Sequence, residues 1–363
     1  MRDDNYKARV KAHLGEALRW NRETEFELAE GLIAGLGFVG PILFAALFGE
    51  LPLGVAASAG SLPIGTVAAG RSAGDLARNL ALALMPTLFA AGLGVALVDA
   101  GWEGKLLVVV LAGIAALLGG YSRTAAIVTT RFTLFLIITL SLAAATPHRL
   151  LLMLLLAGGA IWTTLLWLLF GTLARARENA GPAIADGPQS APTRAEKLTR
   201  WRALLQQFGG WQYAAKLTPC LAAAAVLDLN YPDHHLHWIS LTIVLLAQRR
   251  VDLMPVKITQ RALGAALGGI VAGLSVAARP PVWLLIAGIG LIAGTRPLLK
   301  ARHYLSYSAM MTTLIVLMMD FEQPLEQAVL ADRTLATFIG GSLVVVANLA
   351  GNRIAARLAG DSS

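Results

Sequence analysis

One arginine stands inside an apolar stretch long enough to form a membrane-spanning helix. Arg131 follows Arg123 by eight residues, which places it roughly 12 Å along that helix, next to Thr130. A guanidinium at this depth in hydrocarbon needs a partner or a wet cavity. No acidic residue lies at a matching depth in the predicted spans, so an organic anion is one candidate partner. Snorkelling or bonding to backbone carbonyls is the structural alternative.

Two prolines interrupt apolar segments at matching places. Pro41 lies nine residues before Glu50, and Pro219 lies nine residues before Asp228. Proline removes a backbone donor from a helix, and paired breaks in the two halves of a transporter mark its substrate site. The alternative for both prolines is a plain structural kink.

Aromatic and sulfur-containing side chains form a stripe in a later segment. Tyr304, Tyr307, Ser308 and Met311 follow the i, i+3, i+4, i+7 spacing of one helix face. Such a face suits a planar apolar ligand with a polar tip. Trp162 offers the same chemistry in another segment. Helix packing or a place at the membrane interface explains these residues as well.

The remaining polar candidates have simple structural explanations. Lys216 lies close enough to a helix end to snorkel. The sequence Asp233-His234-His235-x-His237 resembles a weak zinc site, but no second cluster completes a catalytic site. We therefore interpret it as a solvated loop and expect no metal and no cofactor.

Composition predicts the elements that carry these residues. Hydrophobic residues make up 56% of the 363 residues and charged residues 14%, whereas soluble domains carry about a quarter charged residues. We predict an all-α polytopic membrane protein with about twelve transmembrane helices. They lie near residues 31–49, 51–69, 79–98, 105–120, 124–145, 150–174, 213–227, 237–247, 262–278, 282–295, 304–319 and 334–350.

The basic residues set the orientation of these helices rather than binding nucleic acid. With the N-terminus inside, 24 of the 30 Lys and Arg residues fall in cytoplasmic segments, as the positive-inside rule requires. We therefore expect both termini inside and no cleavable signal peptide. The predicted parts are a cytoplasmic segment (1–29), a first six-helix repeat (30–174), a cytoplasmic linker (175–203) and a second six-helix repeat (204–358).

The two halves share features at an offset of 178 to 182 residues, which predicts a duplication. The offset matches Pro41 to Pro219, Arg71 to Arg249, and Gly158-Gly159 to Gly340-Gly341. Because six spans is an even number, both halves enter the membrane in the same direction. Such parallel repeats are known among transporters, so the pattern favours transport over a helical bundle without flux.

The second half carries a recognisable motif. A Trp-x-x-Leu-Thr helix contains Trp238, an Arg-x-x-Gly-x-x-x-Gly-Gly helix contains Arg261, Gly264 and Gly268, and a closing helix contains Arg333 and Gly340. Residues 213–350 resemble the fusaric acid resistance (FUSC) family of integral membrane transporters. The first half is similar more loosely, and the large cytoplasmic domains of longer members are lacking. The glycines permit close helix approach, and lipid headgroups or a helix cap also explain the two arginines.

The resemblance implies an exporter of small organic, mostly aromatic, acids in the bacterial inner membrane, working beside a periplasmic adaptor protein. Membrane lipids and a second copy of the chain are further expected partners. A passive organic-anion channel is the main alternative, followed by a lipid-modifying enzyme and a scaffold without transport. The sequence contains no Walker, G-x-S-x-G or H-E-x-x-H motif, so we predict that the protein is not an enzyme.

Overall fold

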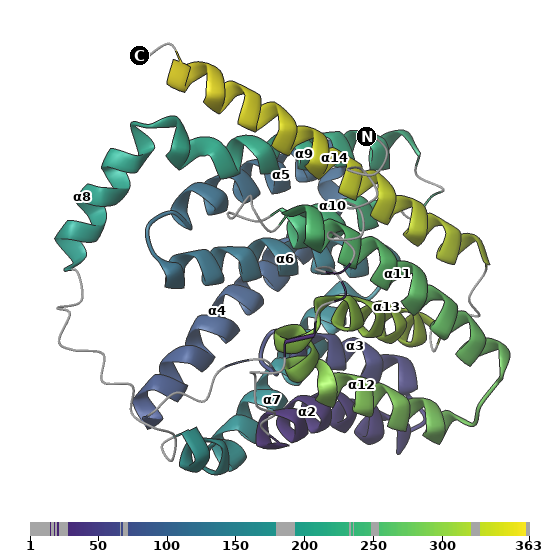
Figure 1. Cartoon of the computed structure of the whole chain (residues 1–363). Coiled ribbons are helices and arrows are strands. Elements are labelled where there is room, and N and C mark those ends of the chain that lie inside the picture. The colour runs from purple at the N-terminus through teal and green to yellow at the C-terminus, as the bar shows by residue number, and fades with distance from the viewer. Residues whose placement is uncertain are drawn as a thin grey trace. The chain divides into compact units, whose positions relative to one another are not determined.

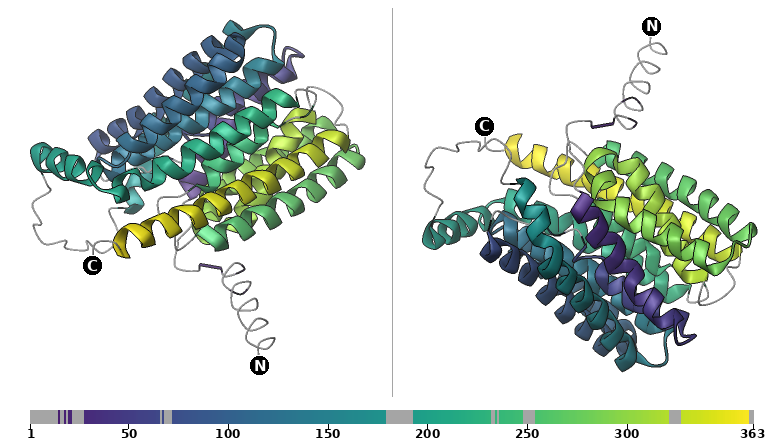
Figure 2. Two further views of the ribbon diagram at one scale, coloured as in Figure 1. Left: turned by 90° about the horizontal axis from the view of Figure 1, so that it is seen from above. Right: turned by 90° about the horizontal axis from the view of Figure 1, so that it is seen from below.

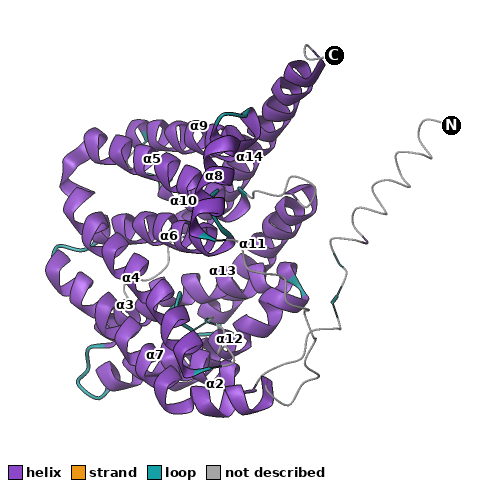
Figure 3. Cartoon of the chain, turned by 90° about the vertical axis from the view of Figure 1, so that its left-hand side faces the viewer, coloured by secondary structure: helices purple, strands orange, loops and turns teal. Residues whose placement is uncertain are grey.

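The computed structural model is helical throughout the part of the chain that it describes, and no strand occurs there (Figures 1 and 3). It describes residues 28–65, 72–178, 193–231, 236–247, 254–320 and 327–360, with the single positions 15, 18, 20, 21, 67 and 234. The predicted N-terminal segment, most of the predicted linker, and Arg71 and Arg249 lie outside the described residues.

All twelve predicted apolar segments overlap helices. These are α2 (Leu28–Ala46), α3 (Leu51–Ser61), α4 (Ala73–Leu97), α5 (Gly101–Leu118), α6 (Arg123–Ala145), α7 (Arg149–Glu178), α9 (Phe208–Asn230), α10 (His237–Leu246), α11 (Met254–Ala277), α12 (Val282–Arg302), α13 (Tyr304–Asp320) and α14 (Gln327–Gly360). The helix α3 ends at Ser61, although the predicted segment 51–69 continued past it. A 3-10 turn, Val98–Ala100, joins α4 to α5.

A further helix, α8 (Arg194–Leu205), lies in the predicted linker and was not anticipated. Its start carries a sequence signal, since Thr193 and Glu196 form a capping box in which each side chain bonds the backbone of the other residue. Ser72 and Asp75 cap α4 in the same way. Caps of this kind set helix boundaries that apolar runs alone leave open.

Several helices have the length and composition of membrane spans. In the described part of the chain these are the stretches Leu28–Ala46, Ala73–Leu118, Arg123–Ala144, Arg149–Gly171 and Val282–Arg302, and four shorter apolar helices accompany them. Large apolar side chains such as Phe44, Phe89 and Trp283 are exposed on these helices, as expected where lipid covers them. The chain is a multi-pass membrane protein, and the count of twelve spans stays a prediction.

The helices form two compact units that each draw on both halves of the sequence. Unit 1 comprises residues 1–67, 154–174 and 250–337, and unit 2 comprises residues 68–153, 175–249 and 338–363. Unit 1 therefore combines α2, α3 and most of α7 with α11, α12 and α13. Unit 2 combines α9, α10 and most of α14 with α4, α5 and α6. These units cut across the predicted boundaries 30–174 and 204–358.

The pattern of neighbours inside one unit corresponds to that inside the other (Figures 1 and 2). In unit 1, α11 packs on α13, and α12 packs on α2 and α13. In unit 2, α4 packs on α6, and α5 packs on α9 and α6. The sequence offset pairs exactly these helices, α4 with α11, α5 with α12, and α6 with α13. A twofold axis relating the repeats stays a prediction.

Glycines allow close helix crossings in unit 1. A Cβ atom on Gly294 of α12 would lie 3.0 Å from the carbonyl oxygen of Gly31 in α2. Where α11 crosses α13, a Cβ on Gly264 would meet Ser308, and one on Gly268 would meet the backbone of Ala309. Small residues at such crossings let membrane helices approach and gain van der Waals contact.

Candidate functional site

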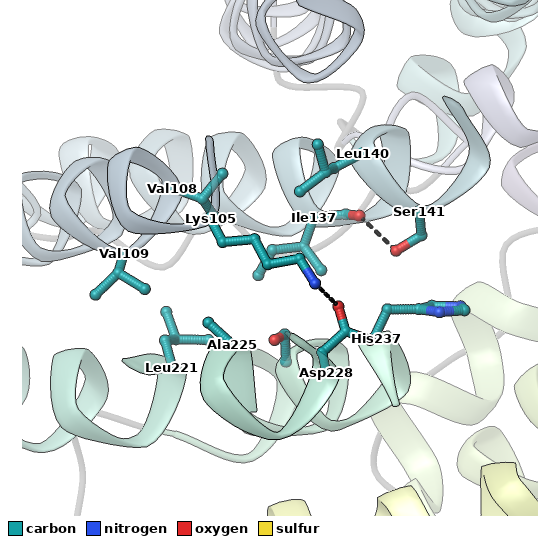
Figure 4. A pocket seen from close by; sticks show the side chains of 11 residues that line it. Lys105, Val108, Val109, Ile137, Leu140, Ser141, Leu221, Ala225, Asp228 and His237 are labelled. Carbon is teal, nitrogen blue, oxygen red and sulfur yellow. Dashed lines mark hydrogen bonds and ion pairs between the residues drawn. The ribbon is translucent and has the colours of Figure 1, made fainter. Parts of the chain in front are cut away.

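Unit 2 contains a small open pocket of about 40 Å³ between α5, α6, α9 and α10 (Figure 4). The lining residues are Lys105, Val108 and Val109 from α5, Ile137, Leu140 and Ser141 from α6, Leu221, Ala225 and Asp228 from α9, and His237 and Ser240 from α10. Four helices therefore contribute side chains to the lining of the pocket.

An ion pair marks one end of this pocket. The Lys105 ammonium lies 2.6 Å from a carboxylate oxygen of Asp228, and the two side chains are 25% and 22% exposed. His237 and Ser141 lie toward the same end, whereas Val109 and Leu221 lie toward the other (Figure 4). The pocket is therefore amphipathic, with a charged end and an apolar end.

The ion pair was not predicted, although the sequence holds a signal for it. Lys105 and Asp228 belong to two separate apolar segments, and no pattern along the chain links them. The signal is that Lys105 opens one apolar segment and Asp228 closes another, so both charges occur at the same membrane depth. Only packing of α5 against α9 makes them neighbours.

Two arginines are buried in unit 1, although the sequence had placed both just outside a predicted span. Arg296 is 4% exposed and lies inside α12, beyond residue 295, where the predicted span ended. It donates to the carbonyl of Leu62, just beyond α3, at 3.0 Å. Arg261 is 5% exposed and donates to the hydroxyl of Ser308 at 3.4 Å.

Neither buried guanidinium is neutralised within the described part of the chain. The ion pairs found there are Lys105–Asp228 and Arg149–Asp99. The Nε atoms of Arg261 and Arg296 have no hydrogen-bond partner among the described atoms. Buried charges are normally paired because desolvation is costly, so these two positive groups are unusual.

The predicted stripe on α13 divides between several contacts in unit 1. The rings of Tyr304 and Tyr307 lie 5.7 Å apart, Ser308 bonds Arg261, and Met311 packs against the apolar core of the unit. The stripe therefore lies beside one buried arginine, and it also contributes to packing.

Arg131 lies half-buried on α6 in unit 2. No described residue forms a hydrogen bond or ion pair with its guanidinium. Thr130 is exposed, and its hydroxyl donates to the carbonyl of Ala126 at 2.8 Å. Neither residue lines the pocket. The expected partner of Arg131 therefore stays a prediction.

The two prolines lie within continuous helices rather than at breaks. Pro41 lies in α2 and is half-buried, and Pro219 lies in α9 and is exposed. Trp162 on α7 donates from its indole nitrogen to the carbonyl of Leu36 at 3.1 Å, a contact that joins α7 to α2.

The remaining predicted residues take largely structural positions. Lys216 is buried rather than snorkelling, and its ammonium donates to the side-chain oxygen of Asn348 at 2.7 Å. Trp238 follows His237 at the start of α10, with ring centres 5.1 Å apart. A Cβ on Gly340 would lie 3.0 Å from Thr242. The side chain of Arg333 lies outside the described residues.

Metal-binding side chains do not gather in the described residues, where no group of three His, Cys, Asp or Glu is close enough to hold an ion. Asp233 and His235 of the histidine-rich loop lie outside those residues.

The membrane-length apolar helices define a multi-pass membrane protein, and two arginines, Arg261 and Arg296, are buried among its helices. Residues 219–347 match a family model described as fusaric acid resistance protein-like, which confirms the resemblance predicted for the second half. Together the match and the membrane-length helices indicate a membrane transporter, consistent with a chain that is not an enzyme. Comparison with curated proteins and with solved structures finds no match.

Proposed function

We propose that the protein exports small organic acids, aromatic ones among them, across the bacterial inner membrane. In this proposal the chain crosses the membrane twelve times with both termini in the cytoplasm. A periplasmic adaptor protein carries the exported acid onward. The membrane-length helices and the family match support the transport part of the proposal.

The choice of an anion depends on one observation, the buried guanidinium groups of Arg261 and Arg296 without a described carboxylate partner. Removing a charged side chain from water without a partner of opposite charge is costly, so buried charges are normally paired. A chain that keeps two such groups needs a compensating anion or water. A passing organic carboxylate supplies that compensation and is stabilised in turn by charge-assisted hydrogen bonds.

The test is flux measured with the purified chain in proteoliposomes. Vesicles loaded with radiolabelled benzoate or a substituted benzoate should release it faster than protein-free vesicles, and the neutral amide of the same ring should show no protein-dependent release. Acceleration that requires an imposed pH gradient favours a proton-coupled exporter. Release that follows only the anion gradient and voltage favours the channel alternative. Equal release with and without protein, for every acid in the panel, refutes the proposal.

A further inference from the structure

We propose that the pocket between α5, α6, α9 and α10 binds a small monocarboxylate with an apolar body, and that its carboxylate replaces Asp228 on Lys105. The proposal rests on the proposed function for the class of ligand and adds the place where that ligand binds. The apolar body would lie along Val109, Leu221 and Ala225, away from the charged end.

Comparison with unit 1 shows that the ion pair is not needed to build this part of the fold. At the 181-residue offset, Lys105 and Val108 correspond to Ile286 and Ile289. Both isoleucines belong to a buried apolar cluster to which α2, α3, α12 and α13 contribute. Its buried members are Phe38, Ile42, Val55, Ile286, Ile289, Ala293, Leu314 and Leu317. The same set of helix neighbours thus closes around apolar side chains in unit 1 and leaves a charged pocket in unit 2.

The energetics of ion pairs strengthen this comparison. A partly exposed ion pair contributes only about 0–1 kcal/mol to stability, so an apolar residue in place of Lys105 costs the fold little. Ile286 shows that an apolar residue fits the position of Lys105 in this fold. Lys105 and Asp228 both line the pocket, and stability does not require their ion pair. A ligand that binds to one of the two charges best explains why they are there.

The charges and walls of the pocket select the ligand class. Among the lining residues, Lys105 is the only Lys or Arg, and His237 contributes an imidazole. One ammonium neutralises one carboxylate, and a second carboxylate of the ligand would meet Asp228 or the apolar wall. The hydroxyl of Ser141 is already bonded to the carbonyl of Ile137 at 2.9 Å. The walls therefore favour an apolar ring or chain over a polar body.

When a ligand carboxylate displaces Asp228 from Lys105, the charge of Asp228 is not left buried without a partner. Its side chain is 22% exposed in the ion pair, so it stays hydrated when a ligand takes Lys105. His237 and Ser240 line the same pocket from α10 and offer alternative polar neighbours. Replacing Asp228 with a ligand carboxylate therefore costs less free energy than opening a fully buried ion pair. This is expected of a site that both binds and releases its ligand.

The experiment measures benzoate binding to the detergent-purified full chain by titration calorimetry. Lys105→Gln should weaken binding about ten- to hundredfold, the value of a charge-assisted hydrogen bond. Asp228→Asn should tighten binding, because it removes the competing carboxylate. Arg149→Gln is the matched control, since it breaks the other described ion pair of unit 2, with Asp99, at residues that do not line the pocket. It should bind benzoate as the wild type does.

Three comparisons complete the test. Benzamide, which lacks the charge, should bind at least tenfold more weakly than benzoate, and equal affinity overturns the proposal. Tighter binding of zwitterionic phenylalanine, which would satisfy both Lys105 and Asp228, also overturns it. If Lys105→Gln fails to fold, the double variant Lys105→Gln/Asp228→Asn avoids an unpaired charge and should still lose benzoate binding.

Flux separates this proposal from the proposed function. If the wild type transports benzoate and Lys105→Gln has the same KM, the proposed binding site is refuted, but the proposed transport function is not. Absence of flux for every acid refutes the transport proposal, whereas benzoate binding that depends on Lys105 in the same protein still supports the pocket.

Discussion

Two adjacent glycines of α11 allow a test of the helix crossing in unit 1. Gly268 faces α13, and a Cβ atom there would overlap the backbone carbonyl of Ala309 and lie 2.8 Å from the Cβ of Thr312. Gly269, the next residue, has nothing within 4 Å of the same added atom. Gly268→Ala and Gly269→Ala therefore add the same methyl group to the same helix, and only the first adds it to the crossing.

The expected difference follows from the contacts. Overpacking a well-packed interface costs about 1–3 kcal/mol, and here the obstacle is backbone that cannot rotate away. Separating the helices also weakens the bond from the hydroxyl of Thr313 to the carbonyl of Gly268, 3.0 Å long and worth about 1 kcal/mol. At either site, the higher helix propensity of alanine adds about 1 kcal/mol to the free energy of unfolding. Gly268→Ala should lose about 1–3 kcal/mol, and Gly269→Ala should gain up to about 1 kcal/mol.

Unfolding in mixed micelles with increasing denaturing detergent measures both free energies. The two variants should shift the midpoint in opposite directions from the wild type, with a total separation of about 1–4 kcal/mol. Equal midpoints for the two variants would refute the inference that this crossing depends on the absence of a side chain at Gly268.

Three further predictions concern other parts of the chain. Trp167→Phe should destabilise unit 1 by about 2–4 kcal/mol in the same assay, because the buried Trp167 indole donates to the carbonyl of Ile64 at 3.0 Å; unchanged stability would contradict this. Arg131→Lys should weaken acid export and Arg131→Gln should weaken it about ten- to hundredfold, measured as vesicle flux, and normal export by folded Arg131→Gln would show a structural role. Reporter fusions after Ala180 and within residues 231–235 should report opposite sides of the membrane, and a shared side would refute the orientation with both termini inside.

Local sequence was sufficient to predict the helices and the membrane class of this protein. Each predicted apolar segment overlaps a helix, because the length and hydropathy of a segment are properties of its own residues. The resemblance of the second half was likewise predictable, since Trp238 and Arg261 form a pattern within one stretch of chain. The helix α8 was missed because its signal is a capping box rather than an apolar run.

The grouping of those helices was not predictable from the same information. Sequence order divides the chain at the linker, yet each compact unit takes helices from both halves. Which apolar face packs against which other face depends on small differences in shape, such as the place of Gly294 opposite Gly31. Hydropathy cannot predict such differences, because it does not distinguish one apolar helix face from another.

The candidate sites show the same division. Sequence alone identified Arg131 as a charge inside a span, because depth along a helix follows from counting residues. It placed Arg296 just outside a predicted span and treated Lys105 and Asp228 as unrelated, although the structure buries the first and pairs the other two at 2.6 Å. Lys105 and Asp228 are separated by 123 residues, and their pairing arises only when α5 and α9 pack together. A charge's position along its own helix is a local property, but its partner is decided by tertiary packing.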